Sequence, residues 1–484
     1  MSIQTILLII YQVVVIAAVI HVLMDNRQPA KTMAWALVIY FVPVVGIILY
    51  IFFGVNTRHE KLVGRRSMDA LTKRSMLAFV EQPDLSLPGE QKSLIDLFVN
   101  QSFALPFGGN DVRLMTDGYQ FFPSLLSDIA AATSHIHIDI YIFEDDPLGT
   151  LLSDVLIAKA RQGVEVRVIY DDVGCWNVST RFFERLRREG IEIEPFMPVR
   201  FPSFARRANY RNHRKLIIID GLIGYIGGMN FALRYVKGTP TTNPSPDTTC
   251  LWRDTMARIE GRGVYALQRA FLVDWYFVDR SLLNEAKYYP STAPQHPSPA
   301  THPLLQVVTS SPTSEEAEIM QGYVRLIMAA RRYVYMETPY FLPTDVVFYA
   351  MKTAARSGVD VRVLVPRSSD ARFTEWASRS YLRRAVEAGI SVQLYEPGFL
   401  HSKLLVVDDE VCSIGSTNID FRSFENNFEA NAFLYGADIA RRVRDIFLAD
   451  EQQSISFDAE PRLRNPRFAV RLLESSARLL SPLL

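Results

Sequence analysis

The chain has 484 residues, and its 52 basic and 52 acidic side chains give a formal net charge of zero. This length leaves room for two or three domains with their own cores. The balanced charge argues against a nucleic-acid-binding protein, because it creates no global attraction to phosphate backbones. The three cysteines, Cys175, Cys250 and Cys412, fit neither a disulfide framework nor a metal-ligand pattern, which favours a reducing compartment.

Two uncharged apolar runs begin the chain. Residues 3–23 are mostly Ile, Leu and Val, and a second run extends over residues 32–57. Each run is long enough to cross a hydrocarbon core of about 30 Å. We therefore expect a transmembrane helical hairpin over residues 1–57, with spans at 3–23 and 32–53. A cleaved signal peptide is the alternative for the first run, but that run lacks a basic start and a small-residue cleavage site.

Basic residues are concentrated after the second apolar run. Only Arg27 and Lys31 lie between the runs. Six more follow the second run closely, at Arg58, Lys61, Arg65, Arg66, Lys73 and Arg74. By the positive-inside rule, the large C-terminal part then faces the cytoplasm, with the N-terminus on the same side. We expect a multi-pass protein of the cell inner membrane, in which residues 58–109 form a basic juxtamembrane connector.

A strand–helix–strand pattern occupies residues 134–170 and recurs at residues 332–365. The junctions match, because Gly163 and Gly358 each follow the end of a helical pattern and precede a strand with alternating valines. Strands that alternate with helices imply α/β layers. The sequence therefore predicts an α/β fold made of two duplicated halves.

The predicted halves are residues 110–289 and 304–460, joined by a Pro-rich linker at residues 290–303. The tail at residues 461–484 has one charged, mainly basic face and one apolar face at helical spacing: Arg467, Arg471, Glu474 and Arg478 on the first, and Phe468, Leu472, Leu479 and Leu483 on the second. A basic amphipathic helix of this kind suits an anionic membrane surface. An ordinary helix packed on the domain is the alternative.

A duplicated motif carries the chemistry. Both copies have the spacing H-x-K-x4-D and lead to a Gly-[Gly/Ser]-x-Asn turn at the same distance: His213, Lys215, Asp220 and Asn230 in the first, and His401, Lys403, Asp408 and Asn418 in the second. Residues two apart on a strand point the same way, so each histidine and its lysine project together. The glycines of each turn allow its asparagine to approach the histidine and lysine of the same copy.

If the two halves pair face to face, both motifs converge on one phosphate. One imidazole would then attack phosphorus while the other protonates the leaving oxygen. The lysines and asparagines would hold the phosphate oxygens. This chemistry needs no metal and no cofactor, and we expect neither.

Two other groups of residues have the composition of a metal site or of a nucleic-acid site, but we expect neither kind of site. His135 and His137 share a strand face, but no third ligand lies nearby in the sequence, so we expect ordinary strand residues and no metal site. The basic stretch between Arg200 and Arg214 contains aromatic residues, as single-stranded nucleic-acid sites do. Because it leads directly to His213, we expect a mouth that attracts anionic lipid headgroups, and a solvated loop is the alternative.

The duplicated motif resembles the HKD motif of the phospholipase D superfamily, H-x-K-x4-D-x6-G-[GS]-x-N, and both copies match it in full. The resemblance implies an acidic residue, eleven positions after the asparagine, that orients a histidine. Glu429 stands at that distance from Asn418. The first copy departs from this pattern, because the stretch after Asn230 is longer, and Asp254 is assigned as the counterpart.

Within the superfamily, the chain is similar to bacterial cardiolipin synthases with two HKD motifs over nearly its whole length. The resemblance implies two α/β/α sandwich halves that form one catalytic unit. The implied reaction joins two phosphatidylglycerols into cardiolipin and releases glycerol. His213 would form a phosphatidyl-histidine and His401 would act as acid and base. Asp220 and Asp408 belong to the catalytic motif, but we expect them to serve the turn or the contact between halves.

Four alternatives stay open from the residues. A phospholipase D-type hydrolase, or a phosphatidyltransferase with another acceptor, would use the same groups. The zero net charge and the predicted hairpin argue against a nuclease of the same superfamily. Two intact motifs argue against a non-catalytic scaffold, which has no use for paired His/Lys/Asn sets. The expected partners are anionic phospholipid, phosphatidylglycerol above all, and the membrane, with no nucleic acid.

Overall fold

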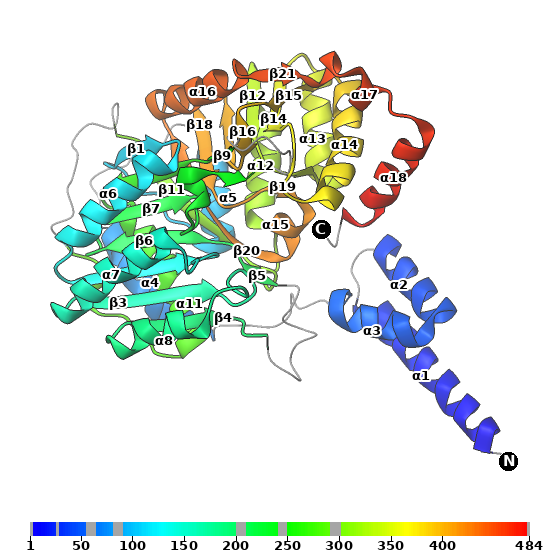
Figure 1. Ribbon diagram of the computed structural model, residues 1–484, viewed down its shortest axis with the longest axis horizontal. Helices are drawn as coiled ribbons and strands as arrows, with labels where there is room; N and C mark the ends of the chain where they lie inside the picture. The colour runs from blue at the N-terminus through cyan, green and yellow to red at the C-terminus, as the bar shows by residue number, and fades with distance from the viewer. Residues whose placement is uncertain are drawn as a thin grey trace.

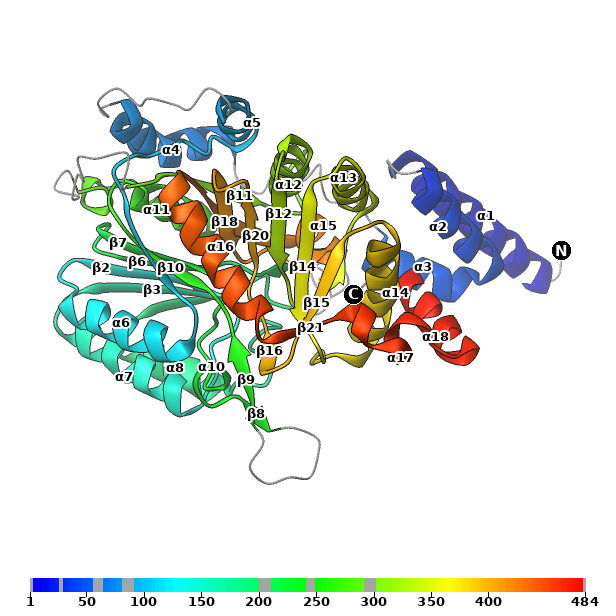
Figure 2. The same ribbon diagram turned by 90° about the horizontal axis from the view of Figure 1, so that it is seen from above.

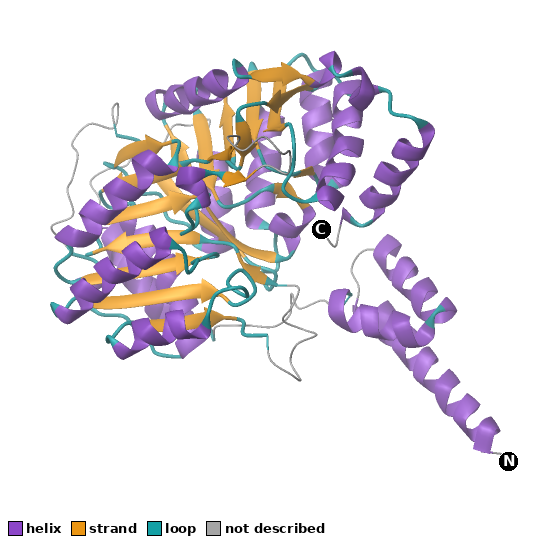
Figure 3. Cartoon of the chain, in the orientation of Figure 1, coloured by secondary structure: helices purple, strands orange, loops and turns teal. Residues whose placement is uncertain are grey.

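The computed structural model describes residues 3–25, 29–54, 64–80, 91–199, 210–240, 249–290 and 302–481. Its main body contains two large β-sheets covered by helices, and a group of N-terminal helices lies apart from that body (Figures 1 and 3). This arrangement confirms the predicted α/β fold with two halves. Most of the predicted Pro-rich linker lies outside the described residues.

The first half is built on a seven-stranded sheet. In spatial order its strands are β1 (Asp111–Met115), β10 (Met256–Glu260), β7 (Ile223–Gly227), β6 (Lys215–Ile219), β2 (His135–Ile140), β3 (Glu165–Asp171) and β4 (Glu192–Phe196). Its helices are α6 (Gly118–Ala131), α7 (Pro147–Arg161), α8 (Thr180–Arg188), α10 (Arg234–Lys237) and α11 (Val264–Asp279). Side chains alternate along β6, so that Ile217 packs with the core under α6, α7 and α8, whereas Leu216 packs with the core under α11.

The second half repeats this plan on a nine-stranded sheet. The main path runs β11 (Leu304–Ser310), β20 (Asn427–Tyr435), β18 (Val411–Gly415), β17 (Leu404–Val407), β12 (Tyr333–Glu337), β14 (Asp360–Pro366), β15 (Ser391–Tyr395) and β21 (Ser454–Ser456). Its helices are α12 (Glu318–Ala329), α13 (Asp345–Arg356), α14 (Arg372–Glu387), α15 (Phe421–Glu425), α16 (Ala437–Glu451), α17 (Pro461–Arg464) and α18 (Phe468–Leu479). β12 lies antiparallel to β17 and parallel to β14, as β2 does to β6 and β3.

Two short strand pairs cross between the halves. β5 (Arg211–Asn212), from the first half, pairs in parallel with the start of β20. β16 (Gly398–Leu400), from the second half, pairs in parallel with β9 (Thr249–Arg253), which also pairs with β8 (Thr239–Pro240). One hydrophobic core contains residues of both halves, such as Ile218 and Val406. The two halves therefore form a single unit, and each motif histidine directly follows a crossing strand.

The N-terminal segment differs from the predicted hairpin of two long helices. α1 (Ile3–Asp25) is long and apolar enough to cross a membrane, and it is the only such helix among the described residues. The second apolar run forms two helices, α2 (Pro29–Phe41) and α3 (Pro43–Phe53), and neither alone would span about 30 Å.

The break in the second run lies at Pro43, which has no backbone N–H and disfavours a helical conformation at the preceding Val42. α3 then packs back onto α2, where an added Cβ at Gly46 would lie 2.8 Å from the carbonyl oxygen of Val38. The prediction of one continuous second span over residues 32–53 is therefore wrong.

The segment expected as a connector contains two helices that pack on the main body. α4 (Arg65–Val80) lies on α11, where the Ser67 hydroxyl donates to the Tyr276 hydroxyl at 3.0 Å. α5 (Lys92–Ser102) lies on α12, and the Phe98 ring packs 4.5 Å from that of Phe433. In Figure 2, α4 and α5 lie along one edge of the body, and α1–α3 lie at the end where α17 and α18 are found.

Candidate active site

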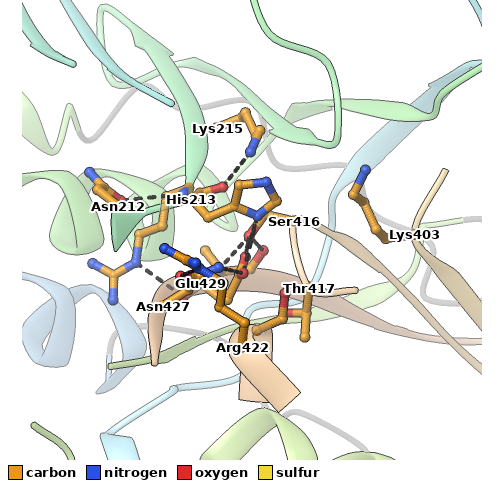
Figure 4. A network of polar contacts seen from close by, with 12 residues as sticks. Asn212, His213, Lys215, Lys403, Ser416, Thr417, Arg422, Asn427 and Glu429 are labelled. Carbon is orange, nitrogen blue, oxygen red and sulfur yellow. Dashed lines mark hydrogen bonds and ion pairs between the residues drawn. The ribbon is translucent and has the colours of Figure 1, made fainter. Parts of the chain in front are cut away.

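The first motif histidine is oriented by the second half. The N–H of His213 donates to the carbonyl of Phe428 at 2.9 Å, which continues the β5–β20 pairing. This pairing brings His213 Nδ1 to 3.1 Å from each carboxylate oxygen of Glu429 (Figure 4). The carboxylate therefore fixes the proton on Nδ1 and leaves Nε2 with its lone pair. The sequence identified Glu429 as an orienting residue, and the structure shows that its histidine is in the other motif.

The second motif histidine has the reciprocal arrangement. The N–H of His401 donates to the carbonyl of Arg253 at 2.7 Å, next to the β16–β9 pair. Its Nδ1 atom lies 2.6 Å from Asp254 Oδ2. Lys403 Nζ also lies 2.8 Å from this Nδ1, but the shorter contact to a carboxylate is the one that fixes the Nδ1 proton. Asp254, which the sequence placed only by analogy across an insertion, thus contacts the histidine of the second motif.

Each carboxylate lies against the glycine turn of its own half. The Ser416 hydroxyl donates to Glu429, and the backbone N–H of Ala430 donates back to that hydroxyl at 3.0 Å. In the first half Gly228 stands at the same turn position, where an added Cβ would collide with the Asp254 carboxylate. The first motif therefore has Gly228 at this position, because the Asp254 carboxylate leaves no room for a side chain. The second motif has Ser416 there, whose hydroxyl donates to Glu429.

The two motif lysines are fully buried beside the histidines. Lys215 Nζ donates to the carbonyl of His213 at 2.6 Å and lies 5.1 Å above the Tyr141 ring. Lys403 Nζ donates to the carbonyl of His401. In Figure 4, Lys403 from the second half is drawn to one side of the His213–Glu429 pair, and its charge contributes to lowering the pKa of His213. The two motifs, predicted to converge, therefore share one site.

Burial controls the protonation of this site. Desolvation lowers the pKa of His213 to about 4 and that of His401 to about 3, so both imidazoles are neutral near pH 7. Desolvation also lowers the pKa of Lys215 to about 7 and that of Lys403 to about 8. A phosphate anion placed among these groups would favour their charged forms, because it supplies the missing negative charge.

Burial alone would raise the pKa of each orienting carboxyl, but hydrogen bonding and electrostatic interaction with the neighbouring histidine and lysine outweigh that effect. The pKa of Glu429 is lowered chiefly by His213, and that of Asp254 chiefly by Lys403 and His401. Both carboxylates therefore stay charged near pH 7. Each can keep an imidazole in one tautomer and stabilise the imidazolium that forms during proton transfer.

The turn asparagines form hydrogen bonds with residues other than their own motif histidines. Asn230 is bonded to the Tyr235 hydroxyl at 3.1 Å, and this hydroxyl lies 3.3 Å from His401 Nδ1. Asn230 therefore connects to the histidine of the other motif, through a tyrosine that sequence reasoning missed. Asn418 is buried and hydrogen-bonds Asp420. Contacts of either asparagine with its own motif histidine are not among the hydrogen bonds of the described residues.

The motif aspartates lie at the far ends of the strands from the histidines. Asp220 accepts the backbone N–H groups of three consecutive residues that lead into β2, at 2.8–2.9 Å: Thr133, Ser134 and His135. Asp408 does the same before β12, at 2.6–2.9 Å, with Arg331, Arg332 and Tyr333. We therefore correct the assignment of these two aspartates to the catalytic residues. Each aspartate anchors a loop within its own half, which agrees with the expected role in a turn.

Two arginines next to the histidine–carboxylate pairs also cross between the halves. Arg214 Nε donates to the carbonyl of Glu429 at 3.0 Å, and its guanidinium pairs with Asp274. Arg253 pairs with Asp450 at 2.6 Å and donates to the Thr255 hydroxyl at 3.0 Å. The sequence signal for these contacts is adjacency to His213 and Asp254, and Arg214 also belongs to the predicted basic stretch.

The structure describes only part of the predicted basic mouth. Residues 200–209 lie outside the described residues. Arg211 and Arg214 are buried, and Arg211 lies 3.5 Å from Asp171. The prediction that these two guanidinium groups face incoming headgroups is wrong, because each is paired with a buried carboxylate.

His135 and His137 are buried strand residues, as expected. Gln268 lies 3.2 Å from His135 Nε2 and 2.9 Å from His137 Nδ1. Burial lowers the pKa of His135 to about 4 and that of His137 well below its usual value. Within the described ranges, no group of three or more His, Cys, Asp or Glu residues could hold a metal ion.

Comparison with known proteins identifies the family. The profile of the family described as "Cardiolipin synthase, PLD-like domain" matches residues 125–240 and 323–451, which contain both motifs. The chain is 38% identical to the major cardiolipin synthase ClsA of Bacillus subtilis over the full length of both proteins. It belongs to the cardiolipin synthases of the phospholipase D superfamily. The cardiolipin synthase of Oceanobacillus iheyensis is also 38% identical, again over the full length of both.

Two further comparisons fit this family. The profile described as "Phospholipase_D-nuclease N-terminal" matches residues 13–54, which span α2, α3 and the second half of α1. Among solved structures, the chain is similar to the phosphatidylserine synthase of Haemophilus influenzae, with a TM-score of 0.62 over 82% of this chain and 100% of that one. The sequence identity is 14%, so this likeness shows a shared fold.

Proposed function

We propose that this protein joins two phosphatidylglycerol molecules into cardiolipin and releases glycerol. The observation that carries the proposal is the reciprocal pairing of two buried histidines with carboxylates from opposite halves, beside two buried lysines. This arrangement supplies a nucleophile, an acid–base group and cations for the phosphate in one site. Full-length similarity to cardiolipin synthases supports the choice of substrate.

In the first step, Nε2 of neutral His213 attacks phosphorus, and the bond from phosphorus to the glycerol oxygen breaks. We assign the attack to the first-motif histidine, as the resemblance to the superfamily implies. His401, protonated once the anionic substrate is bound, gives its proton to the departing oxygen. The products of this step are free glycerol and a phosphatidyl-histidine.

In the second step, neutral His401 accepts the proton of a hydroxyl on the second phosphatidylglycerol. The resulting oxygen attacks phosphorus, the phosphorus–nitrogen bond breaks, and His213 returns to its neutral form. Lys215 and Lys403 stabilise the charge on the phosphate oxygens in both steps, and we propose that Asn230 and Asn418 assist them. Glu429 and Asp254 hold the imidazoles in the required tautomer.

The test uses the purified full-length protein, phosphatidylglycerol vesicles and EDTA, followed by separation of the lipids. We expect cardiolipin and an equal amount of glycerol. Phosphatidic acid as the sole product would establish a hydrolase instead, and a requirement for added metal would refute the metal-free chemistry. His213→Ala and His401→Ala should each abolish turnover, because a single site needs both. One fully active variant would refute the shared site.

We also propose that α1 spans the inner membrane, that the second apolar run completes the membrane segment, and that the catalytic part faces the cytoplasm. The proposal rests on the apolar length of α1 and on the basic residues that follow the second run. Fusions at the C-terminus test the orientation. Fluorescence of green fluorescent protein is expected, and activity of a periplasm-dependent alkaline phosphatase at the same position would contradict it.

A further inference from the structure

The C-terminal helix α18 is fixed on the second half by one narrow face. It packs on α14 through Glu474 and Ala477, which are its buried residues. The Glu474 carboxylate forms an ion pair with Arg383, whose guanidinium also donates to the carbonyl of Leu463 at 3.0 Å. A buried ion pair of this kind fixes which side of the helix faces the protein.

The opposite side of α18 is apolar and open. Phe468 is 80% exposed, Leu472 is 57% exposed and Leu479 is 77% exposed. At 3.6 residues per turn, these three side chains fall within about 40° of one another. Leu473 and Leu480 are also exposed and widen the surface. Exposing contiguous apolar side chains of a helix to water costs free energy, and exposed patches of this kind mark interaction surfaces.

A basic edge borders this apolar surface. Arg467, Arg471 and Arg478 project within about 40° of each other, next to the stripe of Phe468 and Leu479. Glu474 is the only acidic residue between positions 467 and 481, and it is neutralised by Arg383. An apolar face with an arginine border is the pattern of a helix that lies in the headgroup region of an anionic bilayer.

The position of α18 agrees with a lipid surface. In both Figure 1 and Figure 2, α18 lies at the end of the main body where α1–α3 are found. α1 is the described helix that is long enough to cross a bilayer. A bilayer that contains α1 therefore lies on the side of the molecule on which α18 is packed.

We propose that α18 docks on the anionic membrane surface through the surface formed by Phe468, Leu472, Leu473, Leu479 and Leu480, with Arg467, Arg471 and Arg478 at the phosphate level. The helix would then be a second attachment, besides the N-terminal segment, and would hold the catalytic unit in one orientation against its lipid substrates. This attachment does not depend on which alcohol accepts the phosphatidyl group.

The test places a tryptophan on the surface of full-length protein reconstituted in vesicles with phosphatidylglycerol. Phe468→Trp is compared with Leu151→Trp, a similar change at a half-exposed leucine of α7, at the other end of the body in both views. Emission of the parent protein is subtracted from each. We expect lipids brominated near the top of their acyl chains to quench the added emission of the Phe468→Trp variant and to leave that of the Leu151→Trp variant unquenched.

Equal quenching at the two positions, or none at position 468, would overturn the proposal. A blue shift at position 468 that rises with protein density and resists the brominated lipids would also overturn it, since it would indicate a second copy of the chain. As a functional arm, Leu472→Glu with Leu479→Glu should lower the quenching at position 468 in the Phe468→Trp background and lower turnover on vesicles. The paired Ser475→Glu and Ser476→Glu changes, which add the same charge without removing leucines, should lower both less.

Discussion

His213 Nδ1 lies 3.1 Å from both carboxylate oxygens of Glu429, a residue 216 positions later in the chain and in the other half of the protein. His401 has the reciprocal relationship with Asp254, at 2.6 Å. Because each imidazole is oriented by the opposite half, neither half holds a complete histidine–carboxylate pair. The geometry of the two histidine–carboxylate pairs is therefore a property of the interface between the halves.

Removing the negative charge from either orienting carboxyl should impair catalysis more than folding. We expect Glu429→Gln and Asp254→Asn each to lower kcat by about 100-fold or more, because the amide no longer stabilises the imidazolium or fixes its tautomer. Steady-state kinetics on phosphatidylglycerol vesicles measure the effect. Glu387→Gln, at an exposed position of α14, is the matched control and should be unchanged. A loss below threefold at either carboxyl would contradict its assigned role.

Arg214 should act on the site as well as on stability. Arg214→Met leaves the Asp274 carboxylate buried without its partner, which should cost about 3–5 kcal/mol of unfolding free energy. Adding Asp274→Leu should recover most of that loss. We expect kcat of the double variant to stay low, because the guanidinium also holds the carbonyl of Glu429. Thermal unfolding and kcat are measured on Arg214→Met, on Asp274→Leu and on the double variant, which separates the effect on stability from the effect on catalysis. Full recovery of both stability and kcat in the double variant would show that Arg214 is purely structural.

The motif aspartates should contribute to stability and little to chemistry. Asp220→Ala removes the acceptor for three backbone N–H groups and should destabilise the fold by about 1–3 kcal/mol, while kcat at a permissive temperature stays within a few-fold.

A pH titration of stability provides a second readout for Asp220. Burial alone would raise the pKa of Asp220, but these N–H donors outweigh it and lower the pKa. Its contribution to stability is therefore complete above its usual value of 3.8 and is lost as pH falls through the lower folded value. A kcat loss as large as that of His213→Ala would refute the structural role.

Phosphate binding should be coupled to proton uptake. Burial lowers the pKa of Lys215 to about 7 and that of Lys403 to about 8, so part of each amine is neutral near neutral pH. A bound anion favours the ammonium forms, and the affinity for a phosphodiester should therefore fall as pH rises through this range. Calorimetry with a soluble glycerophosphodiester, in buffers of different ionisation enthalpy, counts the protons. Affinity and proton count that do not change between about pH 6 and 9 would contradict the lowered pKa values.

The repeated spacing of the motifs was enough to identify the histidines and lysines that lie together in the structure. The continuously apolar strands after His213 and His401 also indicated a buried sheet, and Gly163 and Gly358 both adopt the positive φ expected after a helix. These features are local, since they depend on alternation along a strand or on the backbone conformation of a single residue. Local patterns of this kind can be recognised without knowing the fold.

The pairing of each histidine with the opposite half is not a local property. It depends on two-residue and three-residue strand pairs, β5–β20 and β16–β9, whose partners are far apart in the chain and carry no periodicity of their own. For the same reason Tyr235 had no sequence signal as a site residue, and Arg214 had only its adjacency to His213 and its place in the predicted basic stretch. Pro43 did provide a local signal for the break between α2 and α3, but the absence of charge around it favoured one continuous span.

Transient formation of a phosphatidyl-histidine is the step that most directly tests a shared two-histidine site. Rapid mixing of the full-length protein with phosphatidylglycerol, quenching in the millisecond range, and peptide mass spectrometry measure glycerol release and the modified residue together. We predict a burst of glycerol equal to the amount of protein before cardiolipin accumulates, with the phosphatidyl adduct on His213. Cardiolipin and glycerol that appear together from the start, with no adduct on either His213 or His401, would contradict the mechanism.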